Sequence, residues 1–82
     1  MDRESIVKTI NKLLVEEFEL EESAITPNAH LKDDLGLESL DFVDIAVIVK
    51  KEYGITLKGA EVSSIRTMEN LYDYIYNCTQ NK

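Results

Sequence analysis

A chain of 82 residues is long enough for one small domain and too short to bury two separate hydrophobic cores. Hydrophobic residues make up 44% of it and charged residues 30%, which excludes a disordered chain, and three glycines with one proline leave few turns for a many-stranded sheet. The net charge of -7 argues against binding to nucleic acid and to anionic lipid, and it favours partners with a positive patch. We therefore expect a single, mainly helical domain over residues 1–82.

Cysteine usage and hydropathy indicate the compartment. The single cysteine, Cys78, cannot form an internal disulfide, and no cluster of Cys and His has the spacing of a metal site. The longest apolar run, Ile45–Val49, is far shorter than the roughly 20 residues of a membrane span. The first residues also lack a basic and then apolar signal segment. We expect a soluble, cytoplasmic protein without a metal ion.

Three segments have apolar residues at every third or fourth position, the pattern of an amphipathic helix. The first runs from Ser5 to Phe18. The second begins near Glu38 and Ser39, whose residue types suit a helix start, and it ends before Gly54. The last begins near Thr67, a good N-cap residue.

The connections between these helices differ in kind. Residues 23–37 form a long loop, because Pro27 disfavours helix before it, Gly36 permits a tight turn and spaced leucines pin the segment to the core. A loop of this length in a compact domain is more often functional than not. Residues 55–59 predict an extended link, since one short strand has no partner, and a helical turn follows around residues 60–64. The fold class is all-α: a small four-helix bundle with three main helices, one short helix and a long first loop.

Charge and hydropathy single out the region around the second helix. Residues 1–41 hold eleven acidic and four basic residues, so the whole net charge belongs to this half. The second helix itself is apolar around much of its circumference, with one register through Leu40 and Val43 and another through Phe42 and Ile45. More than one of its faces must be covered or used.

Ser39 is the obvious candidate nucleophile, but its surroundings do not fit a hydrolase. A nucleophile elbow requires glycine two residues before and two residues after the serine, and Leu37 and Asp41 occupy these positions. The only imidazole that could act as a base is His30, nine residues upstream in the loop. A small hydrolase using Ser39 stays a minor alternative.

The acidic residues that cluster between positions 33 and 44 do not have the spacing of a calcium site. An EF-hand loop that starts at Asp33 would place Leu35 and Leu37 at its third and fifth positions, where oxygen ligands are required. The acids instead suit a solvated helix start that complements the helix dipole.

The stretch D-L-G-L-E-S-L-D, residues 34–41, closely resembles the phosphopantetheine attachment motif of acyl carrier proteins, usually D-L-G-x-D-S-L-[DE]. The resemblance covers nearly the whole chain, including Asn28-Ala29 in the loop and T-M-E-N-L at residues 67–71. It implies that Ser39 carries 4'-phosphopantetheine, donated by coenzyme A and attached by a separate phosphopantetheinyl transferase. The phosphodiester would lie at a helix N-terminus, which favours an anion.

The resemblance also implies partner and cargo residues. In the family, acidic and apolar positions near the serine dock on basic patches of the transferase and of the acyl-chain synthesis enzymes, and the acyl chain is held between the second, third and fourth helices. The implied partner-binding residues are Glu38, Leu40, Asp41, Asp44 and Val47. The implied acyl-pocket residues, which have the spacing of core residues as well, are Phe42, Ile45, Ala46, Val62 and Ile65.

Four positions depart from the family pattern. Glu38 replaces the usual aspartate before the serine, which keeps the charge and moves it by one methylene. Lys50 and Lys51 stand where carriers of fatty-acid synthesis usually continue an acidic helix, which points to a specialised pathway. Phe42 is bulkier than the usual residue and would narrow the entrance to an acyl pocket.

The sequence therefore predicts a monomeric, non-catalytic carrier of acyl thioesters in fatty-acid or polyketide-type synthesis. An aminoacyl or D-alanyl carrier shares the same attachment motif and remains an alternative. A third alternative is an acidic helical adaptor without a prosthetic group.

Overall fold

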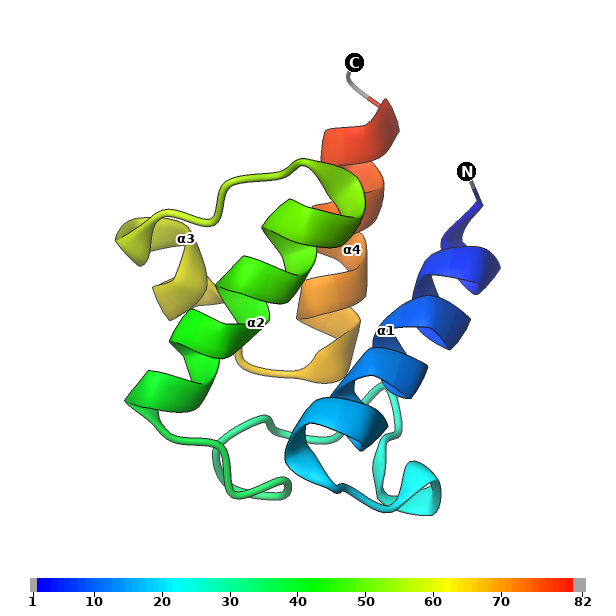
Figure 1. Ribbon diagram of the computed structural model, residues 1–82, viewed down its shortest axis with the longest axis vertical. Helices are drawn as coiled ribbons and strands as arrows, with labels where there is room; N and C mark the ends of the chain where they lie inside the picture. Colours follow the sequence, from blue (N-terminus) through cyan, green and yellow to red (C-terminus); the bar gives the residue numbers. More distant parts are fainter. Residues whose placement is uncertain (1, 81–82) are drawn as a thin grey trace.

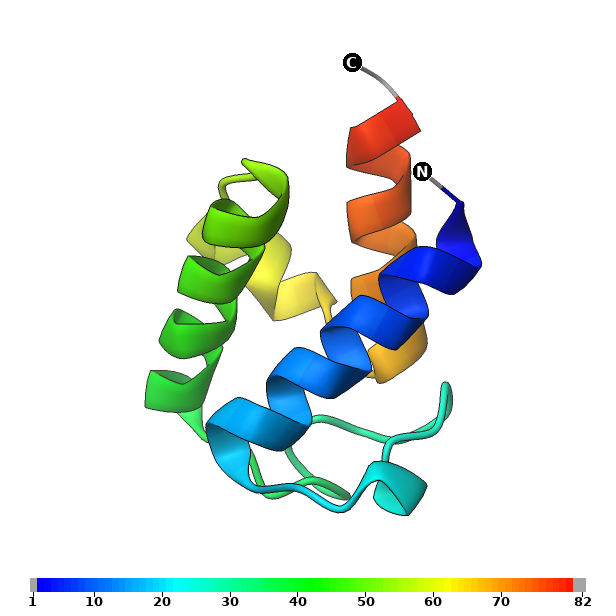
Figure 2. The same ribbon diagram turned by 45° about the vertical axis from the view of Figure 1, so that its right-hand side comes forward.

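The computed structural model describes residues 2–80, with the backbone alone for Ser39 and for residues 59–61. Within this part of the chain the fold is all-α, as predicted, with three main helices and one short one (Figure 1). The start of α1 and the end of α4 lie at one end of the bundle and the long first loop at the other (Figures 1 and 2). The helices are α1 (Arg3–Phe18), the 3-10 helix η1 (Glu22–Ala24), α2 (Ser39–Tyr53), α3 (Gly59–Ser64) and α4 (Met68–Gln80).

Helix α1 starts two residues before the predicted Ser5, because Asp2 serves as its N-cap. The Asp2 carboxylate accepts a hydrogen bond of 2.8 Å from the backbone N–H of Ser5. This bond also lowers the pKa of Asp2. The helix ends at the predicted Phe18, where Glu19 turns the chain with a φ of 55°.

The core lies where one face each of α1, α2 and α4 meet. Every main helix contributes apolar residues at a spacing of three or four, so the predicted periodicity corresponds to the buried faces. Cys78 of α4 is partly buried against this core. The buried residues of the three helices are Ile6, Ile10, Leu14, Ile45, Val49, Tyr53, Met68, Leu71, Tyr72 and Ile75.

Backbone hydrogen bonds hold the long loop to the segment before α4. The N–H of Leu31 donates to the carbonyl of Arg66 at 2.9 Å, and the N–H of Met68 donates to the carbonyl of Ala29 at 3.0 Å. Leu31 and Leu37 are both buried, which confirms that spaced leucines pin the loop to the core. The loop is thus irregular in secondary structure but fixed in place.

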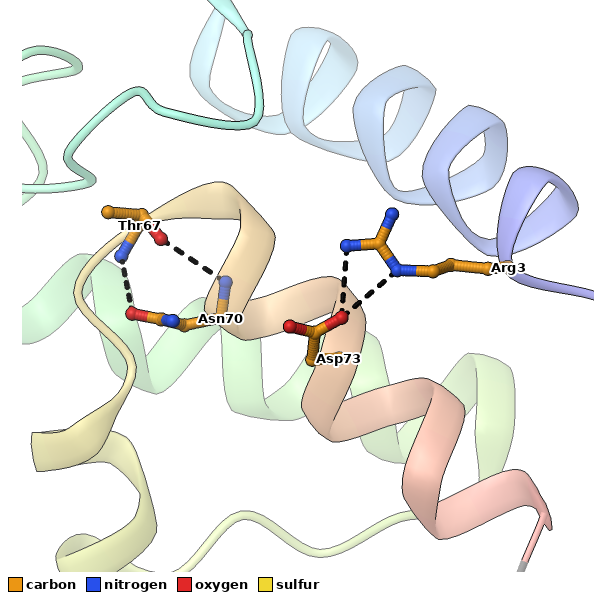
Figure 3. A network of polar contacts seen from close by, with 4 residues as sticks. All are labelled: Arg3, Thr67, Asn70 and Asp73. Atoms are coloured by element: carbon orange, nitrogen blue, oxygen red, sulfur yellow. Dashed lines mark hydrogen bonds and ion pairs between the residues drawn. The ribbon is translucent and has the colours of Figure 1, made fainter.

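Helix α4 begins with reciprocal capping, which confirms Thr67 as its N-cap (Figure 3). The Thr67 hydroxyl accepts from the N–H of Asn70 at 3.2 Å, and the Asn70 side-chain carbonyl accepts from the N–H of Thr67 at 3.2 Å. Each bond gives an acceptor to a backbone N–H group that would otherwise lack a partner within the helix. The cap fixes the direction in which α4 leaves the loop.

Polar side chains join α1 to α4 at the rim of the core. The Arg3 guanidinium forms an ion pair of 3.0 Å with Asp73 (Figure 3), and it lies 5.7 Å from the centroid of the Tyr72 ring. The Tyr72 hydroxyl donates a hydrogen bond to Asn11, and burial raises the pKa of this tyrosine. These contacts complement the apolar packing between the two helices.

Helix α2 ends where predicted, before Gly54. The Gly54 backbone has a φ of 71°, a left-handed conformation that side chains resist, and its N–H donates to the Lys50 carbonyl at 2.9 Å. The predicted link of residues 55–59 is one residue shorter in the structure, because Gly59 already belongs to α3, which begins one residue before the predicted helical turn at 60–64.

Two valines of α2 allow a matched test of its buried face. Val49 is 0% exposed and Val47 is 59% exposed. We expect Val49→Ala to lower the free energy of unfolding by about 2 kcal/mol, because two buried methyl groups and their packing are lost. Val47→Ala should change it by less than about 0.5 kcal/mol. Urea unfolding followed by circular dichroism measures both, and equal losses would contradict the assignment of the two faces.

Candidate functional site

The chain leaves the core directly before Ser39. Leu37 is 3% exposed, and its N–H donates to the carbonyl of Leu31 at 2.9 Å within the fixed loop. Glu38 is exposed and extended, with φ -108° and ψ 179°, and Leu40 is 79% exposed. Ser39 is therefore the first helical residue between two exposed neighbours, at the loop end of the bundle (Figure 1). Its hydroxyl group, the predicted attachment point, lies outside the described side chains.

Gly36 shapes the approach to this helix start. Its φ of 71° is a conformation that side chains rarely adopt, and a Cβ built at this position would have no heavy atom within 4 Å. The glycine is thus required by the backbone turn rather than by a close approach of other groups. This turn lets the chain reverse between the exposed loop and the buried Leu37.

The start of α2 is stabilised by its own carboxylate. The Asp41 carboxylate, three residues into the helix, accepts a hydrogen bond of 2.8 Å from the N–H of Glu38. The N–H groups of Asp41 and Phe42 both donate to the Glu38 carbonyl, at 2.9 and 3.2 Å. The N–H groups of Ser39 and Leu40 have no acceptor within the helix, since they belong to its first turn. An anion attached to Ser39 would find these two donors and the positive end of the helix dipole.

The predicted partner residues at the start of α2 and along it differ in how exposed their side chains are. Glu38 and Asp44 are exposed, whereas Asp41 is half-buried beside the cap that it forms. Leu40 and Val47 are exposed large hydrophobic residues, at 79% and 59%. Val43, 59% exposed, lies on the same helix face and was missing from the predicted set. The register through Leu40 and Val43 was the signal for it, and we call Leu40, Val43 and Val47 the apolar stripe.

The predicted pocket residues are distributed over three places. Phe42, Val62 and Ile65 line one hollow of about 370 Å³ between α2, α3 and the long loop. Ile45 is 3% exposed and belongs to the core. Ala46 lines a different groove on α2. The polar and charged residues around the first hollow are His30, Lys32, Asp33, Ser63 and Arg66.

A second hollow, of about 360 Å³, lies beside the neighbours of the serine. It is lined by Leu37 and by Glu38 and Leu40 on either side of Ser39, and it shares Lys32 and Phe42 with the first hollow. Phe42 is partly buried and lines both hollows. That its side chain narrows an entrance to an acyl pocket stays a prediction.

The Asp34 carboxylate has a structural task in the loop, since it accepts a hydrogen bond of 2.7 Å from the backbone N–H of His30. The His30 residue is exposed. Within residues 2–80 no group of three or more His, Cys, Asp and Glu side chains is arranged to hold a metal ion. None of the helices in the same part of the chain has the length and hydrophobicity needed to cross a membrane.

Comparison with known proteins identifies the family of this chain. Residues 8–75 match the family described as "Phosphopantetheine attachment site". The acyl carrier protein of Rubrobacter xylanophilus is 32% identical over 75 residues, which cover 92% of this chain and 93% of the relative. That of Thermotoga maritima is 34% identical over 73 residues, covering 89% and 90%. The chain belongs to the acyl carrier protein family.

The structural comparison agrees with the sequence comparison. A solved structure of the acyl carrier protein from Enterococcus faecalis, studied for its high thermal stability, superimposes with a TM-score of 0.78 at 25% identity. The match covers 94% of this chain and 98% of that one. Since the family is defined by the attachment of phosphopantetheine, this group is the cofactor of the chain. A helix that begins at the serine itself, with N–H groups in its first turn that lack an acceptor within the helix, fits such a phosphate-linked group.

The carboxylate cap predicts unequal effects for two neighbouring aspartates. We expect Asp41→Ala to lower the free energy of unfolding by about 1 kcal/mol, because the N–H of Glu38 loses its acceptor. Asp44→Ala removes the same charge one turn later, from an exposed position, and should cost less than about 0.5 kcal/mol. Thermal unfolding of the three proteins measures the difference. Identical melting temperatures for both variants would exclude a capping role for Asp41.

Proposed function

We propose that this chain is a non-catalytic carrier that holds acyl groups as thioesters and delivers them to enzymes of fatty-acid or polyketide-type synthesis. The position of Ser39 supports this best: it is the first residue of a 15-residue helix, it follows the buried Leu37, and it lies between the exposed Glu38 and Leu40. A separate transferase could reach such a residue without unfolding the loop. The attached arm supplies a terminal thiol, the group to which an acyl chain is bound.

The chain's own residues have a limited chemical task in this proposal. Ser39 provides the hydroxyl oxygen, and the first N–H groups of α2 stabilise the negative charge of the phosphodiester. No base in this chain needs to activate the serine, because a transferase brings its own. The Asp41 carboxylate is occupied by the Glu38 N–H, so it secures the helix start rather than acting on a reactant.

Docking to the transferase and to the synthesis enzymes is assigned to the start of α2. Glu38 and Asp44 offer exposed charges to a basic patch, and Leu40 and Val47 of the apolar stripe offer contact area. Exposed ion pairs are weak individually and are screened by salt. Weak contacts suit a carrier that must leave each enzyme after every step.

For the acyl chain, we favour the hollow lined by Phe42, Val62 and Ile65. The two hollows share Lys32 and Phe42, and the second is lined by both neighbours of Ser39, so we propose that a chain bound to the arm folds back past Phe42. The apolar side chains would shield the acyl chain from water. Ile45 and Ala46 are left out of this site by their positions in the core and in another groove.

The proposal extends to the state of the whole chain. We propose that residues 1–82 form one carrier domain that acts as a monomer; Met1 and residues 81–82 lie outside the described part. The cytoplasm is the proposed compartment, supported by the single cysteine of the sequence.

An aminoacyl or D-alanyl carrier would use the same serine. Loading with radiolabelled amino acids or acyl groups by candidate ligases distinguishes the cargoes.

Modification of Ser39 is the direct test. The unmodified protein is incubated with coenzyme A, magnesium and a broad-specificity phosphopantetheinyl transferase, and intact mass is measured. We expect the mass to increase by one phosphopantetheinyl group, and Ser39→Ala should abolish the increase. Ser63→Ala, an exposed serine of α3, is the matched control and should be modified like the wild type.

Two results would contradict this proposal. An unmodified wild type, under conditions that modify a control carrier, would favour the acidic adaptor without a prosthetic group. Ester hydrolysis by the unmodified protein that is lost in Ser39→Ala would favour the hydrolase.

The docking role of the acidic residues predicts a change in transferase kinetics. Glu38→Gln combined with Asp44→Asn removes two exposed charges and leaves the Asp41 cap in place. We expect kcat/KM of the transferase to fall by about threefold to tenfold at low salt, with a weaker dependence on ionic strength. Glu52→Gln with Glu69→Gln removes the same charge elsewhere and should leave kcat/KM unchanged. Equal effects of the two double variants would show that net charge alone matters.

A further inference from the structure

A shallow apolar groove follows the second half of α2. It is lined by Val43, Ala46 and Val47 of the helix and by Thr56 and Leu57 of the extended link, and it measures about 440 Å³. Val43 and Val47 are each 59% exposed, so the helix presents apolar surface to water here. The acyl hollow is a separate place, since it shares none of these residues.

The two charged residues that line this groove are both cationic. Lys50 and Lys51 close its far end, and the Lys50 ammonium donates a hydrogen bond of 3.3 Å to the Thr56 hydroxyl. This bond holds the ammonium charge of Lys50 beside the groove and joins α2 to the extended link. Lysines at a helix C-terminus also complement the helix dipole, but the dipole does not explain why exposed valines lie next to them. The groove therefore combines apolar contact area with a fixed positive rim.

Helix α2 thus changes the sign of its charge along its length. Its first half carries the carboxylates of Asp41 and Asp44, and its last turn carries Lys50 and Lys51, which outnumber the exposed Glu52 beside them. The apolar stripe runs between the two ends and leads into the groove. A partner that lies along the whole helix must match both ends, and a uniformly basic partner would meet like charge at the groove.

We propose that this groove docks a protein partner that presents an apolar side chain flanked by carboxylates. The proposal rests on the proposed function, because each enzyme that handles the cargo must dock on the carrier. Charge complementarity identifies the partner's chemistry, and the valines and Leu57 account for its apolar contact. A second copy of this chain is a poor occupant, since a stable interface takes about 20–30 residues from each side and the groove offers seven. The groove selects enzymes whose docking surface is acidic at this point.

Two matched peptides test the chemistry directly on the full-length, isotope-labelled protein. Both are helical and carry the same leucines, flanked by glutamates in one peptide and by lysines in the other. We expect the glutamate peptide to shift the amide NMR signals of Val43, Val47 and Leu57. It should bind the groove about tenfold more tightly than the lysine peptide at low salt.

Charge variants show whether the lysines cause this preference. Lys50→Glu with Lys51→Glu should reverse it, and Lys50→Gln with Lys51→Gln, which avoids new charges at the helix end, should remove it. Lys8→Glu with Lys12→Glu on α1 changes the net charge by the same amount and should leave the preference intact. All variants are first modified at Ser39 by the transferase, so a failure of the carrier function appears there as a missing mass increase.

Three outcomes would overturn the groove proposal while the carrier function stands. Equal binding of the two peptides would remove the charge argument, and signal shifts confined to residues outside the groove would remove the site. Shifts of Val43, Val47 and Leu57 that depend on protein concentration alone would assign the groove to a second copy of the chain.

Discussion

The pairing of the long loop with the segment before α4 is the constraint on which the rest of the structure depends. The backbone bonds from Leu31 to Arg66 and from Met68 to Ala29 fix a loop that has almost no regular structure of its own. Leu37, bonded to Leu31, is held in the core by the same arrangement. Since Ser39 follows two residues later, contacts made by α4 determine where the candidate attachment site is presented.

Helix α2 has a structural face and a binding face, and both are apolar. Ile45, Val49 and Tyr53 repeat every four residues and fill the core, whereas Leu40, Val43 and Val47 stay in water. Exposed apolar side chains bury little surface on folding and add little to stability, so their grouping on one face is best explained by docking. The same helix therefore supports the fold and provides most of the candidate surface, and its two ends differ in charge.

The sequence predicted the elements well where periodicity and caps carry the information. Thr67, Gly54 and the start near Ser39 mark helix ends through local backbone chemistry, which needs no knowledge of neighbours. The candidate site was harder to predict, because helical spacing groups residues by face without saying what covers that face. Phe42, Ala46 and Ile45 are neighbours in sequence, yet they line a hollow, line a separate groove and fill the core, respectively.

By itself the sequence determined the helical class, the family motif around Ser39 and the concentration of acidic residues in the first half of the chain. These are properties of residue type and local spacing. Only the tertiary structure decided which segment the long loop pairs with, that Asp41 is a cap, and that Val43 joins the exposed stripe beside two lysines. Each of these depends on which distant segment packs against which. The residue spacing within one segment does not determine how two segments pack together.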